Sequence, residues 1–383
     1  MIRPVHGGNL AWAAALAGCP ASAIVDFSAS ISPLGPPESA LAAIQAHLSS
    51  LTAYPDPDYG ELRTALGEAL NVDRDWILPG NGSAELLTWA AWDLSKLEAT
   101  YLVTPAFGDY WRALKAFGAQ VLECPLDLKS LEGEILSGLV TDDLSVSNRS
   151  FVSPSLRLPV PLAVDAGSGL QTTDRGLLLN NPHNPTGLLF GKEAIVPYLQ
   201  QLALVVVDEA FMDFLPPEQQ QSSIDCVEEF PNLVILRSLT KFYSLPGLRM
   251  GCAIAHPDIL RRWQLLRDPW PVNALAAAAA AAVVRDTVFE RQTWDWLPVA
   301  RRELFEGLAN LPGLQPFAGA ANFLLVESSM SVSSIQKSLL ERHRILIRDC
   351  LSFPELGDRF FRVAVRSRAD NLRLIAGLGE VIG

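Results

Sequence analysis

The stretch Arg237-Ser-Leu-Thr-Lys-Phe-Tyr-Ser-Leu-Pro-Gly-Leu-Arg-Met-Gly251 joins two apolar runs of the sequence. Asn232-Leu-Val-Ile-Leu236 leads into it, and Met250-Gly-Cys-Ala-Ile-Ala255 continues from its end. Both runs have the length and the apolar content of buried strands. Lys241 is therefore expected on a connection between two buried strands, which is where catalytic side chains are common.

The neighbours of Lys241 suit a reactive amine. Apolar and small residues flank it, Ser238 precedes it and Arg249 follows it. Desolvation and a neighbouring cation both lower the pKa of a lysine, which makes the neutral amine available for a Schiff base. The alternative for Lys241 taken alone is a solvated loop lysine.

Outward from this stretch, short apolar runs alternate with helical patterns. This rhythm predicts an α/β fold with a mostly parallel sheet between helices. The predicted strands are Tyr101–Thr104, Gln120–Cys124, Gly176–Leu179, Ala203–Val207, Leu233–Leu236 and Met250–Ala255. Helices are predicted over Glu38–Leu51 and Glu61–Leu70.

The pattern changes after the alanine-rich run Ala274–Val284, where a smaller α+β domain is predicted. Its helix is expected over Arg291–Leu311, and its strands over Phe323–Glu327, Ile345–Arg348 and Phe361–Val365. We expect three parts: an N-terminal arm over residues 1–37 that joins the small domain, a large domain over 38–273, and the small domain over 274–383. The segment between Leu128 and Asp174 is rich in Ser and Pro, and its pattern predicts no definite structure.

Composition narrows the class of protein. The 383 residues are 49% hydrophobic, which is enough for a large core, and the net charge of −12 comes without a basic cluster. This charge disfavours nucleic acid and anionic membranes as partners. The five cysteines form no Cys-x-x-Cys pair, which favours a reducing cytoplasm. No signal peptide, membrane span or metal-ligand cluster is indicated.

A glycine-rich turn predicts an anion site. Pro79-Gly-Asn-Gly-Ser-Ala-Glu-Leu-Leu87 runs from a turn into a helical pattern. Free backbone N–H groups and the helix dipole at such a start favour a phosphate, here at the amides of Ser83 and Ala84. A simple helix cap at Ser83 is the alternative.

Two strand ends carry polar side chains. Val205-Val-Val-Asp-Glu-Ala-Phe211 ends a buried strand in the carboxylate of Asp208, which needs a partner if it is buried. Asn180-Asn-Pro-His-Asn-Pro-Thr-Gly187 follows another strand, and its Asn and Pro content would also suit an ordinary loop. The alternative for Asp208 is a cap at the end of its strand.

Two further positions are candidates. In Pro105-Ala-Phe-Gly-Asp-Tyr110, Phe107 follows a predicted strand, and core packing is the competing explanation for Phe107 and Tyr110. Arg362 lies within a predicted strand, where an unpaired charge would be costly. A surface salt bridge is the alternative for Arg362.

Together these motifs resemble, in the expected order and over nearly the whole chain, the fold type I enzymes that use pyridoxal 5′-phosphate (PLP). The resemblance implies that Lys241 forms the Schiff base and that Asp208 pairs with the pyridine nitrogen, while Asn184 donates to O3′. It also implies that the pyridine ring of PLP stacks on Phe107. The implied phosphate ligands are Ser83, Ala84, Ser238, Arg249 and, from the second subunit of a homodimer, Tyr54.

Within this family, the chain resembles the L-threonine O-3-phosphate decarboxylases of cobalamin synthesis more than the related histidinol-phosphate aminotransferases. The features that carry this likeness are His6-Gly-Gly-Asn9, Asp26-Phe-Ser…Pro-Leu-Gly-Pro-Pro37, Phe211, Pro269-Trp-Pro-Val-Asn-Ala-Leu275 and Phe361-Arg-Val-Ala-Val-Arg-Ser367. The resemblance implies decarboxylation to 1-amino-2-propanol O-2-phosphate, with His6, Ser32 and Arg362 binding substrate phosphate or carboxylate. The alternatives are a class I/II aminotransferase and a PLP-binding regulator without turnover.

One departure concerns the substrate. Decarboxylases of this kind carry asparagines where this chain has Ser30 and Ser32. A hydroxyl is shorter than an amide and cannot donate twice, so the substrate oxygen served there would be held differently. Phe211 is a second difference, this time from many aminotransferases, because it lacks the tyrosine hydroxyl that would lie near O3′.

Overall fold

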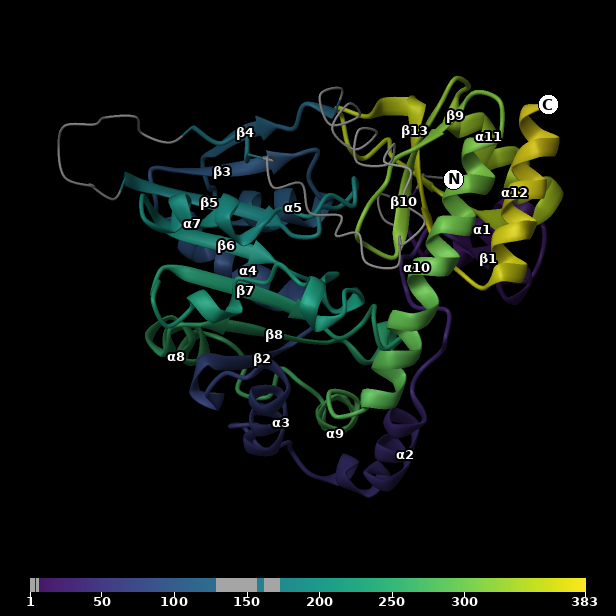
Figure 1. Cartoon of the computed structure of the whole chain (residues 1–383). Helices are drawn as coiled ribbons and strands as arrows, with labels where there is room; N and C mark the ends of the chain where they lie inside the picture. Colours follow the sequence, from purple (N-terminus) through teal and green to yellow (C-terminus); the bar gives the residue numbers. More distant parts are fainter. Residues whose placement is uncertain (1–3, 5–6, 129–156, 162–172) are drawn as a thin grey trace.

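A computed structural model describes residue 4 and residues 7–128, 157–161 and 173–383. A seven-stranded sheet forms its larger part, in the order β2-β8-β7-β6-β5-β3-β4 (Figure 1). Its strands are β2 Ile77–Asn81, β3 Ala99–Thr104, β4 Val121–Pro125, β5 Thr173–Asn180, β6 Leu202–Asp208, β7 Leu233–Ser238 and β8 Met250–Ala255. The pairs from β7 through β4 are parallel, whereas β8 is antiparallel to both β7 and β2. The predicted mostly parallel α/β sheet is confirmed.

Side chains alternate between the two faces of this sheet. In β6, Leu204 and Val206 pack into one buried cluster, while Val205 and Val207 pack into the other. Because successive strand residues point to opposite faces, a sheet covered on both sides needs such a continuous apolar run. The helices α4 Ser83–Leu94, α5 Gly108–Ala116 and α8 Pro257–Leu266 cover the first face, and α7 Lys192–Leu199 and α9 Ala274–Val283 cover the second.

Strand β2 has no counterpart in the sequence prediction, which treats Pro79-Gly80 as part of a turn. The structure places Pro79 inside β2, at the edge of the sheet. An edge strand tolerates proline because one side of it forms no ladder. The turn itself is shorter and lies at Gly82, directly before α4.

A second, four-stranded antiparallel sheet has the order β12-β13-β10-β9. Its strands are β9 Leu314–Pro316, β10 Phe323–Ser328, β12 Arg348–Asp349 and β13 Phe360–Ala364. The helices of this part are α10 Thr287–Ala309, α11 Val332–Ser338 and α12 Arg368–Ile382. The long helix α10 runs from beside α9 up to this sheet and so connects the two parts of the molecule (Figure 1).

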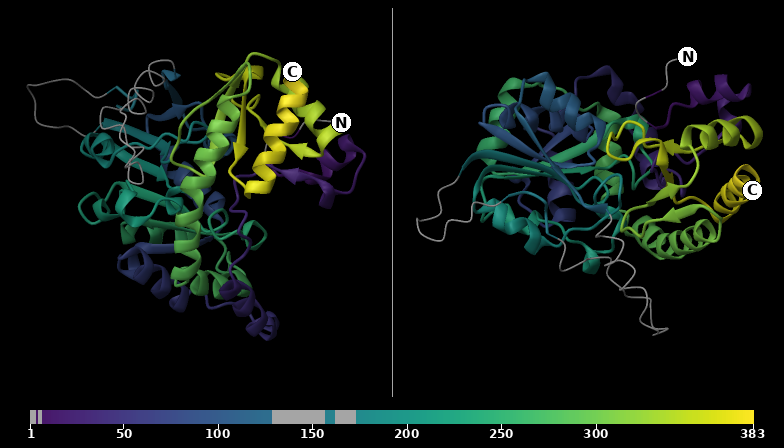
Figure 2. Two further views of the ribbon diagram at one scale, coloured as in Figure 1. Left: turned by 45° about the vertical axis from the view of Figure 1, so that its right-hand side comes forward. Right: turned by 90° about the horizontal axis from the view of Figure 1, so that it is seen from above.

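The predicted strand Ile345–Arg348 is wrong in its extent. The structure divides it into β11 Ile345–Leu346, which pairs with β1 Val25–Asp26, and β12, which pairs with β13. The two halves differ in the strand with which they pair. This division brings the N-terminal segment, with α1 Leu10–Ala17, beside the C-terminal helices, as both views in Figure 2 show.

Two predicted helices differ at their ends, and one of them is the helix predicted over Arg291–Leu311, which the structure has as α10 over Thr287–Ala309. The helix predicted over Glu38–Leu51 ends earlier, as α2 Glu38–Ala46, and a 3-10 helix follows over Leu48–Thr52. Helix α3, Gly60–Leu70, agrees with its prediction to within one residue. The division into an arm and two domains stays a prediction, and most of the Ser- and Pro-rich segment between Leu128 and Asp174 lies outside the described residues.

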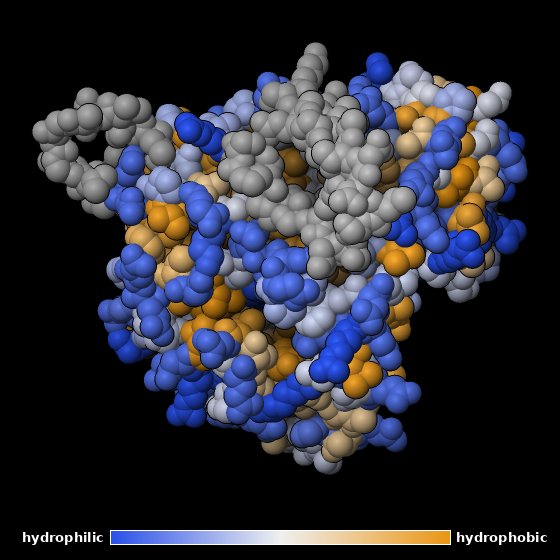
Figure 3. Space-filling view, in the orientation of Figure 1, coloured by the Kyte–Doolittle hydropathy of each residue, from blue (hydrophilic) through white to orange (hydrophobic). Residues whose placement is uncertain are grey.

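The face of the molecule seen in Figure 3 mixes polar residues with apolar ones. Within the described part of the chain, no helix combines the length and apolarity needed to cross a bilayer.

Candidate active site

A cavity of about 290 Å³ opens where β5, β6 and β7 end and the N-terminal segment and β13 approach them. Parallel strands direct their carboxyl ends to one edge of a sheet, and the loops that follow them line this cavity. It collects most of the predicted site residues, namely Ser83, Ala84, Phe107, Asn184, Asp208, Ser238, Lys241, Arg249 and Arg362.

Lys241 lies in the loop after β7, with its Nζ 3.3 Å from Oγ of Ser238. A second hydrogen bond of 2.8 Å joins the hydroxyls of Ser238 and Thr240, so the three polar groups form a chain. Burial lowers the pKa of the Lys241 amine, the charge of Asp208 opposes this, and Arg249 and Arg362 lower it further. A larger neutral fraction of the amine favours nucleophilic attack on a carbonyl carbon.

Asp208 ends β6 and is buried at the wall of the cavity. Its Oδ2 accepts a hydrogen bond of 2.8 Å from the hydroxyl of Tyr110, and its Oδ1 accepts one of 3.0 Å from the backbone N–H of Ala210. Burial raises the pKa of Asp208, while Lys241 and these hydrogen bonds act in the opposite direction. Asp208 lines the cavity, and each of its carboxylate oxygens accepts a hydrogen bond.

The glycine-rich turn forms a narrow cradle. Gly82 has φ +73°, and a Cβ there would lie 2.5 Å from Nη2 of Arg249. A Cβ on Gly251 would lie 2.6 Å from the backbone nitrogen of Ser83. Helix α4 begins at Ser83, so its first N–H groups lack partners within the helix. Because Gly82 and Gly251 have no side chains, the guanidinium of Arg249 and the start of α4 lie close together. Both can therefore bind the same anion.

Arg362 crosses from β13 to the loop after β5. Its Nη1 donates a hydrogen bond to Oδ1 of Asn184, and its Nη2 donates one of 3.4 Å to the carbonyl of Ser28. Burial lowers the pKa of Arg362 to about 10, so it remains charged at neutral pH. Its buried Nε has no hydrogen-bond partner among the described residues. An Arg362 with an unused donor at a cavity suits an anionic ligand better than a surface salt bridge.

The N-terminal segment closes one side of the cavity through Gly7, Ser28, Ala29, Ser30 and Ile31. The hydroxyl of Ser30 is buried there without a partner among the described residues. Ser32 is placed differently and does not line the cavity. Its backbone N–H donates to the carbonyl of Lys241, 3.0 Å away, and its own carbonyl accepts from the hydroxyl of Ser244 at 2.7 Å.

Two other predicted residues are not brought to the cavity. His6 lies outside the described residues, so its predicted role stays a prediction. Tyr54 is 78% exposed and stacks on Trp270, with ring centroids 4.4 Å apart. It does not line the cavity of its own chain.

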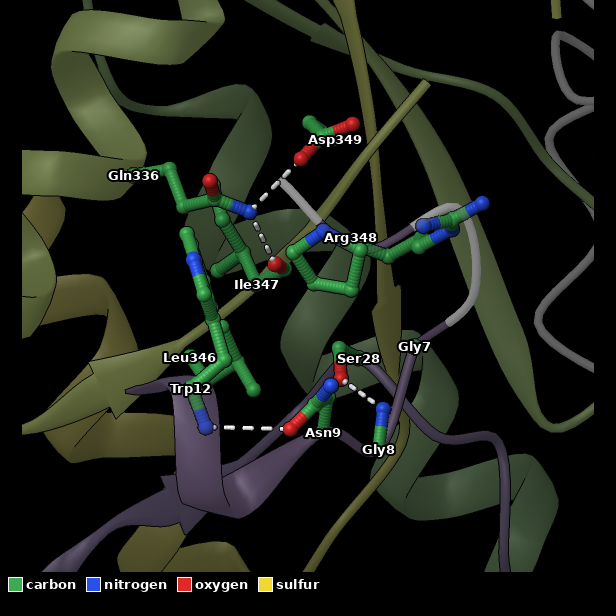
Figure 4. Close-up of a pocket in the computed structure, with 11 residues that line it drawn as sticks. Gly7, Gly8, Asn9, Trp12, Ser28, Gln336, Leu346, Ile347, Arg348 and Asp349 are labelled. Carbon is green, nitrogen blue, oxygen red and sulfur yellow. Dashed lines mark hydrogen bonds between the residues drawn. The ribbon is translucent and has the colours of Figure 1, made fainter. Parts of the chain in front are cut away.

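Sequence reasoning missed Arg348. It lies on β12 opposite Arg362 of β13, and both side chains are buried. Arg348 lines a small pocket that shares Gly7 and Ser28 with the main cavity, and Figure 4 shows it extending beside the Gly7 segment. The available signal was an arginine that follows the apolar run Ile345-Leu-Ile347 in a predicted strand, the same signal that singled out Arg362.

These residues fit PLP. The cradle at Gly82 suits its phosphate, the amine of Lys241 suits its aldehyde, and the buried carboxylate of Asp208 suits a protonated ring nitrogen. The described residues contain no group of three or more His, Cys, Asp or Glu side chains that could hold a metal ion.

Comparison with known proteins supports this interpretation. The family model for aminotransferase class I and II matches residues 22–378. A threonine-phosphate decarboxylase from Salmonella typhimurium is 36% identical over 387 residues, covering 100% of this chain and 98% of the relative. An adenosylcobalamin biosynthesis bifunctional protein, CobDQ, from Leptospira interrogans is 26% identical and covers 100% of this chain, which spans 41% of that relative.

The fold has solved counterparts. A histidinol-phosphate aminotransferase from Sinorhizobium meliloti, in complex with PLP, superposes with a TM-score of 0.76 at 22% sequence identity. The superposition covers 98% of this chain and 94% of that structure, which establishes the fold. The family model and the full-length relative together show that this chain belongs to the class I and II aminotransferase family.

Proposed function

We propose that this protein is a PLP-dependent lyase that decarboxylates L-threonine O-3-phosphate to (R)-1-amino-2-propanol O-2-phosphate in cobalamin biosynthesis. The observation that carries the proposal is the pair of buried guanidinium groups, Arg362 and Arg348, on adjacent strands beside the Lys241 cavity. Two buried cations suit a substrate with two anionic groups, here a carboxylate and a phosphate. The full-length relative from Salmonella typhimurium and the Leptospira interrogans protein support the reaction and the pathway.

The residues of this chain take distinct roles in the cofactor site. Ser83, Ala84, Ser238 and Arg249 hold the phosphate of PLP, Phe107 stacks on its ring, and Asn184 donates to O3′. Asp208 keeps the ring nitrogen protonated, because a buried carboxylate is stabilised by a cationic partner. When bound, PLP supplies the electron sink for the pair that remains on the substrate Cα as CO2 leaves.

Other residues act on the substrate. Lys241 would hold PLP through its amine and, with substrate bound, would supply a free amine in the cavity. It can carry the proton that returns to Cα after CO2 has left. Arg362 binds one anionic group of the substrate, and its Nε, which has no partner within the described part of the chain, offers a further donor. His6, by the sequence resemblance, completes the substrate site in this proposal, and Ser30, which lines the cavity where Ser32 does not, adds a hydroxyl that has no partner among the described residues.

We further propose a homodimer with shared active sites in the cytoplasm. Tyr54 would reach the phosphate site of the partner subunit, which its 78% exposure allows. Trp270, on which Tyr54 stacks, and Leu48 and Leu51 of the 3-10 helix before Tyr54 are also exposed, which favours burial of this region against a second copy. The five cysteines are free, as suits a reducing compartment.

The reaction is tested by incubating the purified, PLP-loaded protein with L-threonine O-3-phosphate without any oxo acid and measuring released CO2. Catalytic CO2 release by the native protein, absent in Lys241→Ala, is the expected result. No CO2 together with conversion of the cofactor to pyridoxamine phosphate would make the protein an aminotransferase, such as a histidinol-phosphate aminotransferase. Binding of PLP without turnover of any amino acid would make it a regulator.

The shared site has its own test. Lys241→Ala and Tyr54→Phe subunits are each expected to have reduced activity, and mixing them should restore one native site in each hybrid dimer. Sedimentation gives the oligomeric state in the same samples. A monomer, or a mixture no more active than its components, would contradict the shared site.

A further inference from the structure

Tyr110 lies between the two residues that the proposed function places against the cofactor ring. It is on α5, and only 1% of its surface is exposed. Its hydroxyl donates to Oδ2 of Asp208 at 2.8 Å. Its ring packs edge-on against Phe107, with centroids 5.7 Å apart and an interplanar angle of 88°. One side chain therefore contacts both Asp208 and Phe107.

The direction of the hydrogen bond is determined by its surroundings. Burial, and next the charge of Asp208, raise the pKa of Tyr110 well above its usual value, so the hydroxyl keeps its proton and donates. The groups that face Asp208 are Tyr110, the N–H of Ala210, the charge of Lys241 and the charge of Asp109. Of these, the hydroxyl of Tyr110 is the side-chain group that donates directly to the carboxylate.

Burial alone would favour the protonated, neutral form of Asp208, and a neutral acid cannot stabilise a cationic ring nitrogen. A donated hydrogen bond stabilises the ionised form. With Oδ1 bonded to Ala210 and Oδ2 bonded to Tyr110, the plane of the carboxylate is also held in one orientation. Each oxygen retains capacity for a further hydrogen bond.

We propose that Tyr110 is a positioning residue that keeps Asp208 ionised and oriented toward the ring nitrogen of PLP, while its ring fixes Phe107 at the ring face. The inference rests on the role that the proposed function gives Asp208. Packing alone does not require the hydroxyl, since phenylalanine would fill the same volume and keep the edge-on contact with Phe107. A positioning role therefore predicts that loss of the Tyr110 hydroxyl affects the bound cofactor, whereas packing alone predicts that it does not.

Tyr110→Phe, loaded with PLP, provides the test. Two readouts are used: the rate at which PLP is released to an excess of apo-acceptor protein, and the ¹⁵N resonance of PLP labelled at its ring nitrogen. Release is expected to be about 10- to 100-fold faster, the range for loss of a hydrogen bond to a charged group. The ¹⁵N resonance is expected to move toward that of the neutral pyridine, because the proton shifts to Asp208.

Tyr198→Phe is the matched control. Tyr198 is another buried tyrosine, and its hydroxyl contacts the carbonyls of Leu158 and Val160 at 3.1 and 3.0 Å. Its removal is expected to lower stability without moving the ¹⁵N resonance. A Tyr110→Phe protein with native release rate and native ¹⁵N resonance would overturn the inference.

Asp208→Asn separates this inference from the proposed function. If Asp208→Asn moves the ¹⁵N resonance and Tyr110→Phe does not, the inference on Tyr110 fails and the role of Asp208 stands. If neither moves it, the role of Asp208 fails as well. Should Tyr110→Phe not fold, 3-fluorotyrosine at position 110 keeps the ring and the hydroxyl, and its ¹⁹F resonance is expected to shift when PLP binds. A resonance that does not move would also overturn the inference.

Discussion

Arg362 donates a hydrogen bond to the side-chain oxygen of Asn184, which joins the four-stranded sheet to the loop after β5. Because this bond occupies the oxygen of Asn184, the amide NH₂ is the half of the side chain that remains to donate to a ligand. The residue proposed for the substrate thereby orients the residue proposed for O3′ of the cofactor. Substrate binding at Arg362 and cofactor electronics at Asn184 are expected to be coupled.

Replacing Arg362 with lysine should weaken substrate binding. Lysine keeps the charge but cannot form the planar, two-point contact that a guanidinium offers to a carboxylate or phosphate. The expected rise in KM is about 10- to 100-fold, the range for hydrogen bonds to charged groups. Arg368→Lys is the control, because the Arg368 side chain is 76% exposed and pairs with Glu303. An unchanged KM in Arg362→Lys would rule out the substrate role.

Replacing Gly82 with alanine should impair binding of the cofactor phosphate. The new Cβ would lie 2.5 Å from Nη2 of Arg249, and φ +73° is strained for any residue with a Cβ. Gly247→Ala is a close control in the Arg249 loop, since a Cβ there meets no atom within 4 Å. Equilibrium dialysis should show at least about tenfold weaker PLP binding for Gly82→Ala, by about 1.4 kcal/mol, and native binding for Gly247→Ala. Equal affinities would show that the phosphate lies elsewhere.

Replacing Lys241 with alanine should abolish the visible absorbance band of covalently bound PLP. The band depends on an imine with this amine, whose pKa is lowered mainly by burial. Lys337→Ala, on an exposed part of α11, should retain the band. The spectrum is measured after gel filtration to remove free PLP, and a band that persists in Lys241→Ala would place the imine on another lysine.

Stability should decrease as the pH is lowered below about 6.5, because of His183. Burial lowers the pKa of His183 to about 3 from its usual 6.5, so the folded protein keeps it neutral while the unfolded chain takes up a proton. The contribution of neutral His183 to the free energy of unfolding is complete above pH 6.5 and is lost as the pH falls toward 3. The loss is about 1.4 kcal/mol for each pH unit in this window.

His183→Asn should remove this part of the pH dependence. Urea unfolding of the PLP-loaded protein at pH 7 and pH 5 should show a smaller drop for the variant than for the native protein. His47→Asn, at the exposed end of α2, should leave the native drop unchanged. Parallel curves for the native protein and His183→Asn would contradict the assignment.

Local patterns were sufficient for much of the fold. Met250–Ala255 was predicted with its observed bounds, and the predicted strand over Leu233–Leu236 lies within β7. The glycine-rich turn and the asparagine loop were located because glycine, proline and asparagine act on the backbone within a few residues. Resemblance to a family, and no physical pattern, connected these loops to PLP.

Strand directions and strand pairing partners could not be predicted from local sequence patterns. The antiparallel entry of β8, the added edge strand β2 and the division of Ile345–Asp349 between two sheets depend on which segments pair. Tyr110 shows the same limit, because core packing is the competing explanation for it in the sequence, whereas in the structure its hydroxyl donates to Asp208.

The sequence by itself determined most of the segments that become strands and helices and where the reactive side chains lie along the chain, because hydrophobic period and turn chemistry act over a few residues. Only the tertiary structure decided that Arg362 meets Asn184, that Arg348 lies opposite Arg362, and that Ser30 rather than Ser32 lines the cavity. These contacts join residues far apart in the chain, and they form where burial of the whole sheet determines which strands become neighbours.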